Sequence, residues 1–94
     1  NVVSANILSA TAPKAAGKVF NIGCGQPLDI NELVETLNGL LETDIRPQYA
    51  PIRIGDVRDA WADITLAHRV LDYQPVVDVT EGLRRTVDYL RERM

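Results

Sequence analysis

The fold that the sequence predicts is decided by residues 18–50, which begin Lys18-Val19-Phe20-Asn21-Ile22-Gly23-Cys24-Gly25. Residues 18–22 form a short run rich in β-branched and aromatic side chains, with glycine on both sides, and this pattern predicts a buried strand. Further along, Ile45-Arg46-Pro47-Gln48-Tyr49-Ala50 alternates in hydropathy. Pro47 has no backbone N–H to donate, so this second run is predicted to be an edge strand.

The segment between these two runs carries the clearest helical pattern in the chain. Asp29 stands at the N-cap position, and Glu32, three residues later, can complete a capping box. Apolar residues then recur at intervals of three and four, as on one face of a helix: they are Ile30, Leu33, Val34, Leu37, Leu40 and Leu41. Strand, helix and strand in succession predict a right-handed parallel crossover. We therefore expect an α/β fold, a small β-α-β crossover unit with flanking helices.

Helices are predicted on both sides of this unit. Residues 1–11 carry a helical apolar stripe that stops before Pro13. Asp63 is positioned to cap a short helix, and Asp78, with Glu81 as capping-box partner, precedes a last helix that runs to the end of the chain. Two strands cannot bury both sheet faces against several helices, so we expect part of the apolar surface to face something outside this chain.

Composition restricts the classes of protein that need to be considered. The chain has 94 residues, of which 46% are hydrophobic and 24% charged, as in globular proteins generally. Its net charge of −3, without a basic cluster, argues against general nucleic-acid binding. No apolar run is long enough to span a membrane. The single cysteine, Cys24, fits a reducing compartment, and we expect a cytoplasmic protein. The chain opens at Asn1 directly into a predicted helix, which suggests a fragment.

The run Gly23-Cys24-Gly25 invites comparison with a dinucleotide-binding loop, because it stands between a predicted strand and a predicted helix. However, Leu28 occupies the position of the third glycine and Pro27 intervenes, so a plain turn that uses glycine at positive φ is favoured. Cys24 has no neighbouring histidine in the sequence, and His68 is the only histidine. No tyrosine is followed four residues later by lysine. We assign no catalytic residue, no cofactor site and no metal site to this chain.

The most informative polar segment is the loop that starts at Pro51, which contains Arg53, Asp56 and Arg58. Arginine pairs with phosphate oxygens in a bidentate manner, while aspartate accepts hydrogen bonds from hydroxyls, so the loop has the chemistry to hold a nucleotide diphosphate. An ordinary surface loop would use the same residues in solvated ion pairs, each worth about 0–1 kcal/mol. The residue types alone leave these two interpretations open.

Taken together, the motifs resemble the C-terminal part of the NAD-dependent nucleotide-sugar epimerases and dehydratases. These are extended short-chain dehydrogenase/reductases, and the UDP-sugar 4-epimerases look nearest. The resemblance covers nearly the whole chain in order and spacing, and its motifs are Val19–Gly25, the R-x-G-D run within Pro51–Arg58, Ala62-Asp63-Ile64, Leu71-Asp72-Tyr73-Gln74-Pro75 and Glu81-Gly82-Leu83. One departure is Asp72, where many relatives have glycine, and it concerns a helix end.

The resemblance implies that the parent protein has an N-terminal Rossmann domain that binds NAD and carries a catalytic tyrosine and lysine, none of which this chain encodes. It implies that residues 1–94 are a single substrate-binding lobe. By position, Arg53 would contact the diphosphate and Asp56 the ribose, with Arg58 near the same loop. We therefore expect the nucleotide-sugar-binding lobe of an NAD-dependent epimerase, inactive without its missing domain and holding no cofactor itself.

Other readings stay open. The parent protein could be a dehydratase or reductase of the same family. The chain could instead be a truncated module that captures nucleotides alone, or one that forms a homodimer through its exposed apolar surface. The expected partners are a nucleotide-sugar substrate and the missing Rossmann domain, with no nucleic acid and no membrane.

Overall fold

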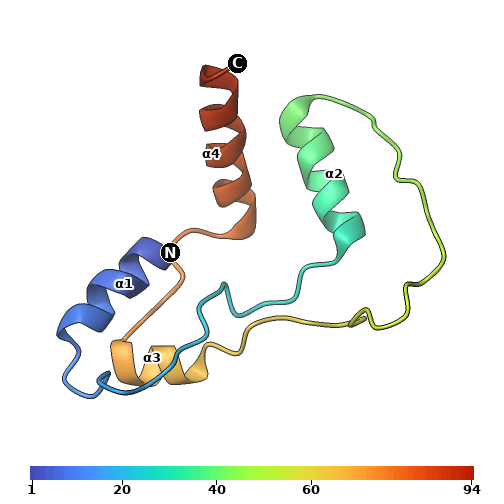
Figure 1. Ribbon diagram of the computed structural model, residues 1–94. Coiled ribbons are helices and arrows are strands. Elements are labelled where there is room, and N and C mark those ends of the chain that lie inside the picture. Colours follow the sequence, from blue (N-terminus) through green and yellow to red (C-terminus); the bar gives the residue numbers. More distant parts are fainter. The chain divides into compact units, whose positions relative to one another are not determined.

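The computed structural model describes all 94 residues and contains four α-helices, shown in Figure 1. Their bounds are α1, Val2–Thr11; α2, Ile30–Leu41; α3, Thr65–Leu71; and α4, Val79–Glu92. The four predicted helices are thus confirmed. No helix has both the length and the apolar character that a membrane crossing requires. The backbone divides into a first unit, residues 1–26 and 61–78, and a second unit, residues 27–60 and 79–94.

The predicted α/β fold is wrong, because the structure contains no strand. Residues 18–22 belong to the first unit and residues 45–50 to the second, and both are irregular. A strand exists only where its backbone pairs with a neighbouring strand, so β-branched and alternating residues without such a neighbour do not make a sheet.

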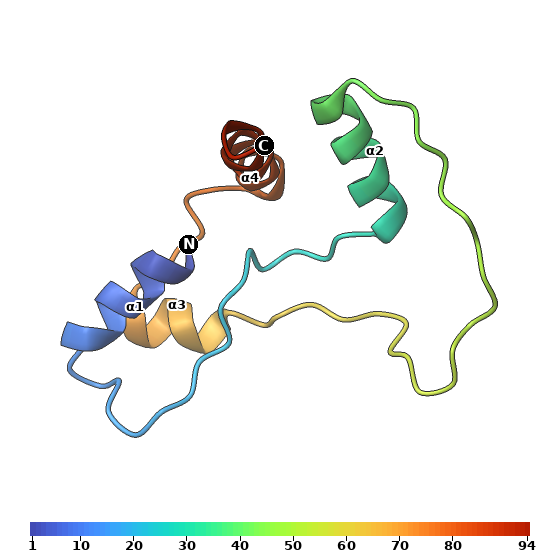
Figure 2. The same ribbon diagram turned by 45° about the horizontal axis from the view of Figure 1, so that its top comes forward.

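The first unit is built around Tyr73, whose side chain is fully buried. Its hydroxyl donates a hydrogen bond of 2.8 Å to the carbonyl oxygen of Gly23, so the buried polar group has a partner. Burial raises the pKa of this hydroxyl, and the nearby Cys24 acts in the same direction. α1 and α3 pack side by side in this unit, as Figure 2 shows. Its buried residues are Ala5, Ala15, Ala67, Leu71 and Tyr73.

The second unit contains α2, α4 and the long loop after α2. The predicted capping box at the start of α2 is confirmed: the Asp29 carboxylate accepts a hydrogen bond of 2.9 Å from the backbone N–H of Asn31, and the Glu32 side chain accepts one from the N–H of Asp29. α2 ends at Leu41, and its C-cap residue Glu42 takes the left-handed conformation with φ +56°. α2 contacts α4, where Val87 is the buried residue.

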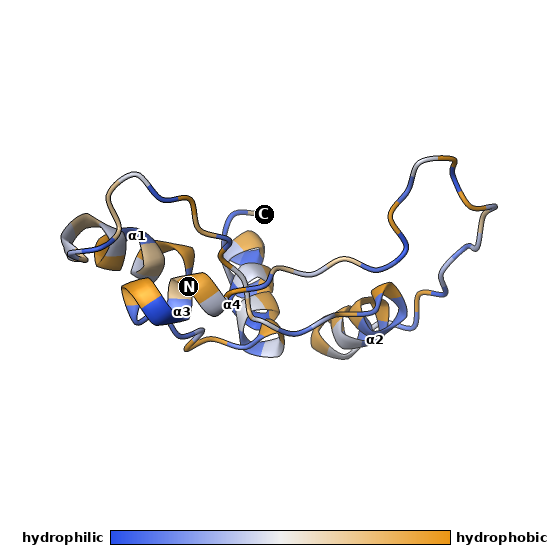
Figure 3. Cartoon of the chain, turned by 90° about the horizontal axis from the view of Figure 1, so that it is seen from below, coloured by the Kyte–Doolittle hydropathy of each residue, from blue (hydrophilic) through white to orange (hydrophobic).

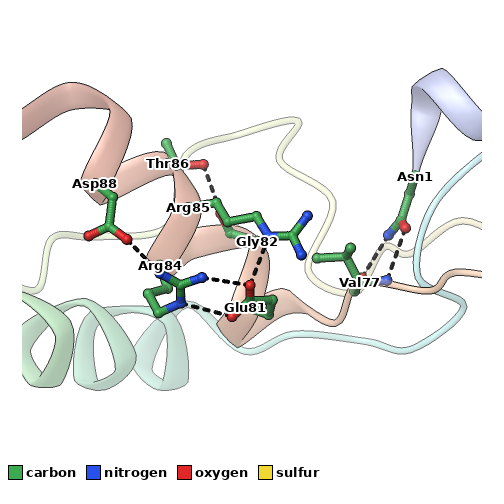
Figure 4. Close-up of polar contacts among 8 residues, drawn as sticks. All are labelled: Asn1, Val77, Glu81, Gly82, Arg84, Arg85, Thr86 and Asp88. Atoms are coloured by element: carbon green, nitrogen blue, oxygen red, sulfur yellow. Dashed lines mark hydrogen bonds and ion pairs between the residues drawn. The ribbon is translucent and has the colours of Figure 1, made fainter. Parts of the chain in front are cut away.

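α4 begins directly after Asp78 and carries a network of ion pairs, drawn in Figure 4. The guanidinium of Arg84 lies 2.8 Å from the Glu81 carboxylate and 2.6 Å from that of Asp88, and Arg85 lies 2.7 Å from Glu81. Hydrogen bonds from Arg84 and then Arg85 lower the pKa of Glu81 to about 2. The capping role of Asp78 stays a prediction.

Candidate functional site

The segment that enters the loop is held against α2 by two asparagines. The Asn38 amide donates to the carbonyl oxygen of Ile45 at 2.9 Å and accepts from its N–H at 3.0 Å. The hydroxyl of Tyr49 donates to the side-chain oxygen of Asn31 at 3.0 Å. Asn31 and Asn38 are about two helical turns apart and so lie on the same face of α2. Residues 45–49 therefore run along this face.

Between α2 and this segment lies an open groove of about 380 Å³. It is lined by Asn31, Val34, Glu35, Asn38, Asp44, Ile45, Arg46, Pro47 and Tyr49. Both asparagine amides already bond to the chain itself. The groove results from the way the entering segment is anchored, and we assign no ligand to it.

Beyond this anchor, Arg53 and Asp56 stand at the two ends of one tight turn. The backbone N–H of Asp56 donates to the carbonyl oxygen of Arg53 at 3.3 Å. Gly55, the third residue of the turn, has φ +93°, whereas the φ angle of Ile54, the second residue, is not positive. These features define a type II turn, in which the first and fourth Cα atoms lie within about 7 Å. The backbone thus brings together the two residues that the sequence singled out.

The charged side chains of this loop are available to a ligand. Arg53, Asp56 and Arg58 are all exposed, and none forms a hydrogen bond or an ion pair through its side chain. The interpretation of the loop as a set of surface ion pairs therefore has no support, because the ion pairs of this structure all lie on α4. Arg58 lies beyond the turn, and no contact links its side chain to the other two.

Exposed apolar residues alternate with these charges. Ile52 and Ile54 expose 91% and 105% of their surface, and Figure 3 shows hydrophobic and hydrophilic residues alternating along the loop that follows α2. Nothing within the chain covers these side chains, although apolar residues are usually covered by protein or ligand when they cluster.

In the first unit, Gly23 and Gly25 pack closely against the residues that follow the loop. A Cβ atom at Gly23 would lie 3.1 Å from the Cβ of Ala62, and one at Gly25 would lie 2.9 Å from Cδ1 of Ile64. Gly25 also has φ +73°, which agrees with the predicted turn. Sequence reasoning missed this packing role, because the sequence around a glycine does not indicate which distant side chain packs against it.

Asp63 anchors the start of α3. Its carboxylate accepts hydrogen bonds from the backbone N–H of Thr65 at 3.0 Å and from the Thr65 hydroxyl at 2.6 Å. These bonds, with the hydroxyl contributing most, lower the pKa of Asp63. The formal N-cap residue is Ile64, so the predicted cap lies one position early, although the aspartate makes the expected contact.

Cys24 and His68, weighed in the sequence as reactive groups, are both engaged elsewhere. The Cys24 thiol lies 3.8 Å from the carbonyl oxygen of Val77, and Nδ1 of His68 lies 3.1 Å from that of Tyr73. The side-chain amide of Asn1 bonds to both the N–H and the C=O of Val77, as Figure 4 shows. No group of three or more histidine, cysteine, aspartate or glutamate side chains is placed to hold a metal ion.

No protein-family model matches this chain, but comparison with known proteins finds similar sequences and a similar solved structure. One solved structure is similar to this chain: the crystal structure of UDP-glucose 4-epimerase with UDP-glucose from Thermotoga maritima. The two sequences are 41% identical, and the two structures superpose with a TM-score of 0.85. The match covers 98% of this chain and 29% of the epimerase chain. The chain is a relative of the nucleotide-sugar 4-epimerases. The resemblance to the C-terminal part of this family, inferred from the motifs, is confirmed.

Curated 4-epimerase sequences agree with this assignment. UDP-glucuronate 4-epimerase from Thermodesulfobacterium geofontis is 33% identical over 82% of this chain, and UDP-glucose 4-epimerase from Mycolicibacterium smegmatis is 34% identical over 89%. The chain spans 24% and 27% of the lengths of these two 4-epimerases, or about a quarter.

Proposed function

We propose that residues 1–94 are the lobe of an epimerase that binds the nucleotide end of a UDP-sugar. The proposal rests on the turn that joins Arg53 to Asp56 and leaves both side chains without a partner. It is supported by the 41% identity to a protein whose crystal structure contains UDP-glucose.

The chemistry of the loop suggests a role for each charged residue. The Arg53 guanidinium would pair with the diphosphate oxygens, because its planar fork matches two of them at once. The Asp56 carboxylate would accept hydrogen bonds from the ribose hydroxyls. Arg58, two residues further on, would add a second positive charge near the diphosphate.

The redox chemistry of the proposed epimerase belongs to a part of the protein outside this chain. NAD does not fit the Gly23-Cys24-Gly25 run, because both glycines are packed against Ala62 and Ile64, leaving no open glycine cradle for its pyrophosphate. We propose that an N-terminal Rossmann domain of the whole protein holds NAD, and that the chain alone is inactive. Binding at the nucleotide would then hold the sugar against a cofactor carried by the other domain.

The missing domain would also cover apolar surface that is exposed here. Val3 and Ile7 of α1 expose 71% and 66% of their surface, and Ile30 of α2 exposes 70%. Val3 and Ile7 are four residues apart and so share one face of α1, and an apolar patch of this kind marks an interaction surface. A homodimer through the same residues is the alternative, and sedimentation of the isolated chain as a monomer would count against it. A cytoplasmic location stays a prediction.

The test uses the full-length gene product that contains this chain, titrated with UDP-glucose in a calorimeter. Arg53→Ala should weaken binding by about 1.5–3 kcal/mol, the range for charged hydrogen bonds. Arg69→Ala is the matched control, because Arg69 is an exposed arginine on α3, outside the loop. Unchanged affinity in Arg53→Ala, or no saturable binding by the wild type, would refute the proposal.

The reaction itself separates epimerase from dehydratase. An epimerase converts UDP-glucose into an isomer of identical mass, whereas a dehydratase yields a product lighter by one water molecule. Mass spectrometry of the incubated substrate, together with chromatography of the sugar released by hydrolysis, distinguishes these outcomes.

A further inference from the structure

We infer that Gly55 is a positioning residue, which holds Arg53 and Asp56 at the spacing that the nucleotide diphosphate requires. The inference rests on the proposed function and adds to it a role for a residue without a side chain. Gly55 would act through the backbone of the turn and would not touch the ligand.

The geometry of the turn depends on the φ angle of Gly55. The third residue of a type II turn needs positive φ, and Gly55 has φ +93°. A residue with a Cβ disfavours this region, by a factor of roughly 5 to 30 in population. A Cβ at position 55 would meet no atom within 4 Å. Replacement by alanine would therefore disturb the turn through its backbone preference and not through a clash.

The turn matters because little else fixes the two charged residues. Their side chains are exposed and unpaired, and the hydrogen bond from Asp56 to Arg53 is the backbone contact that joins them. A turn that is already formed spares the ligand the entropy of ordering the loop. If alanine at position 55 opens the turn, part of the binding free energy of UDP is used to close it again. The affinity for UDP then falls by the factor by which the closed turn loses population.

The chain contains a second turn of the same class, which serves as an internal control. The N–H of Lys18 donates to the carbonyl oxygen of Ala15 at 3.1 Å, and Gly17, the third residue, has φ +73°. A Cβ at Gly17 would also meet no atom within 4 Å. This turn lies in the first unit, and its ends carry no pair of opposite charges.

The experiment compares Gly55→Ala, Gly55→Asn and Gly17→Ala in the full-length gene product, with UDP as the probe. Calorimetry gives the affinity for UDP and thermal unfolding gives the stability of each variant. We expect the two alanine variants to lose similar stability, whereas only Gly55→Ala loses affinity, by roughly 5- to 30-fold. Gly55→Asn should recover most of this loss, because asparagine tolerates positive φ. Amide exchange at Asp56 should accelerate in Gly55→Ala.

The outcomes distinguish a failure of the role of Gly55 from a failure of the proposed function. Equal UDP affinity of Gly55→Ala and Gly17→Ala, while Arg53→Ala binds weakly, would overturn the role of Gly55 and leave the proposed function intact. A loss in Gly55→Ala that Gly55→Asn shares in full would also overturn it, since added volume would then be the cause. Normal binding by Arg53→Ala, or none by the wild type, would instead remove the proposed function.

Discussion

The side-chain amide of Asn38 makes both hydrogen bonds that a neighbouring strand would make to Ile45, at 2.9 and 3.0 Å. Asn1 does the same for Val77 in the first unit, at 2.7 and 3.1 Å. A primary amide carries a donor and an acceptor side by side, so it can stand in for a peptide group. In each unit, then, one asparagine side chain satisfies a stretch of backbone that has no strand beside it.

Removing this substitute should loosen the segment that leads into the loop. We expect Asn38→Ala to lower the free energy of unfolding by about 1.5–4.5 kcal/mol, since three hydrogen bonds of about 0.5–1.5 kcal/mol each disappear, two with Ile45 and one from the Thr43 hydroxyl. Asn31→Ala, which removes only the contact with the Tyr49 hydroxyl, is the control and should cost less. Urea denaturation measures both. Equal losses of unfolding free energy in the two variants would show that the pairing of Asn38 with Ile45 does not stabilise the protein.

Two glycines should respond to alanine in opposite directions. Gly25→Ala combines a positive φ of +73° with an approach of 2.9 Å to Ile64, and we expect a loss of about 1–3 kcal/mol in unfolding free energy. Gly39 lies inside α2 with nothing within 4 Å of an added Cβ. Gly39→Ala should stabilise by about 0.5–1 kcal/mol, because alanine favours a helix interior. Thermal melts of both variants test this, and a shared sign would contradict it.

The end of α3 offers a stabilising substitution. Asp72 takes the left-handed conformation with φ +56° as the C-cap of this helix. Glycine adopts that conformation without a steric cost, so Asp72→Gly should raise the unfolding free energy by about 0.5–1 kcal/mol. Asp72→Ala should lower it, because alanine tolerates the left-handed region less well than aspartate. A glycine variant less stable than the wild type would refute this reading of the cap.

The ion pairs of α4 predict a dependence on pH. The pKa of Glu81 in the folded protein is about 2, below its usual 4.5. Because the folded state lowers this pKa, the contribution of Glu81 to stability is complete above about pH 4.5 and is lost as the pH falls towards 2. An NMR titration of the carboxyl carbon should show the low midpoint. In Glu81→Gln this acid-dependent change should disappear, whereas a midpoint near 4.5 in the wild type would contradict the ion pairs.

The Arg53 site shows how far sequence reasoning reached. The R-x-G-D run pointed to Arg53 and Asp56, and glycine between them is the residue that a type II turn requires. Residue types could not show whether the guanidinium and carboxylate pair with each other, because surface ion pairs are weak and their formation depends on the path of the backbone. The structure leaves both unpaired.

By itself, the sequence determined the helices, since caps such as Asp29 and Glu32 and the spacing of apolar residues act within a few residues of one another. Only the tertiary structure decided that residues 18–22 and 45–50 form no strand, because a strand needs a neighbouring strand to pair with. Ile45 bonds instead to the side chain of Asn38 on α2. The same reason applies to Gly25, whose neighbour Ile64 is distant in the chain and close only after folding.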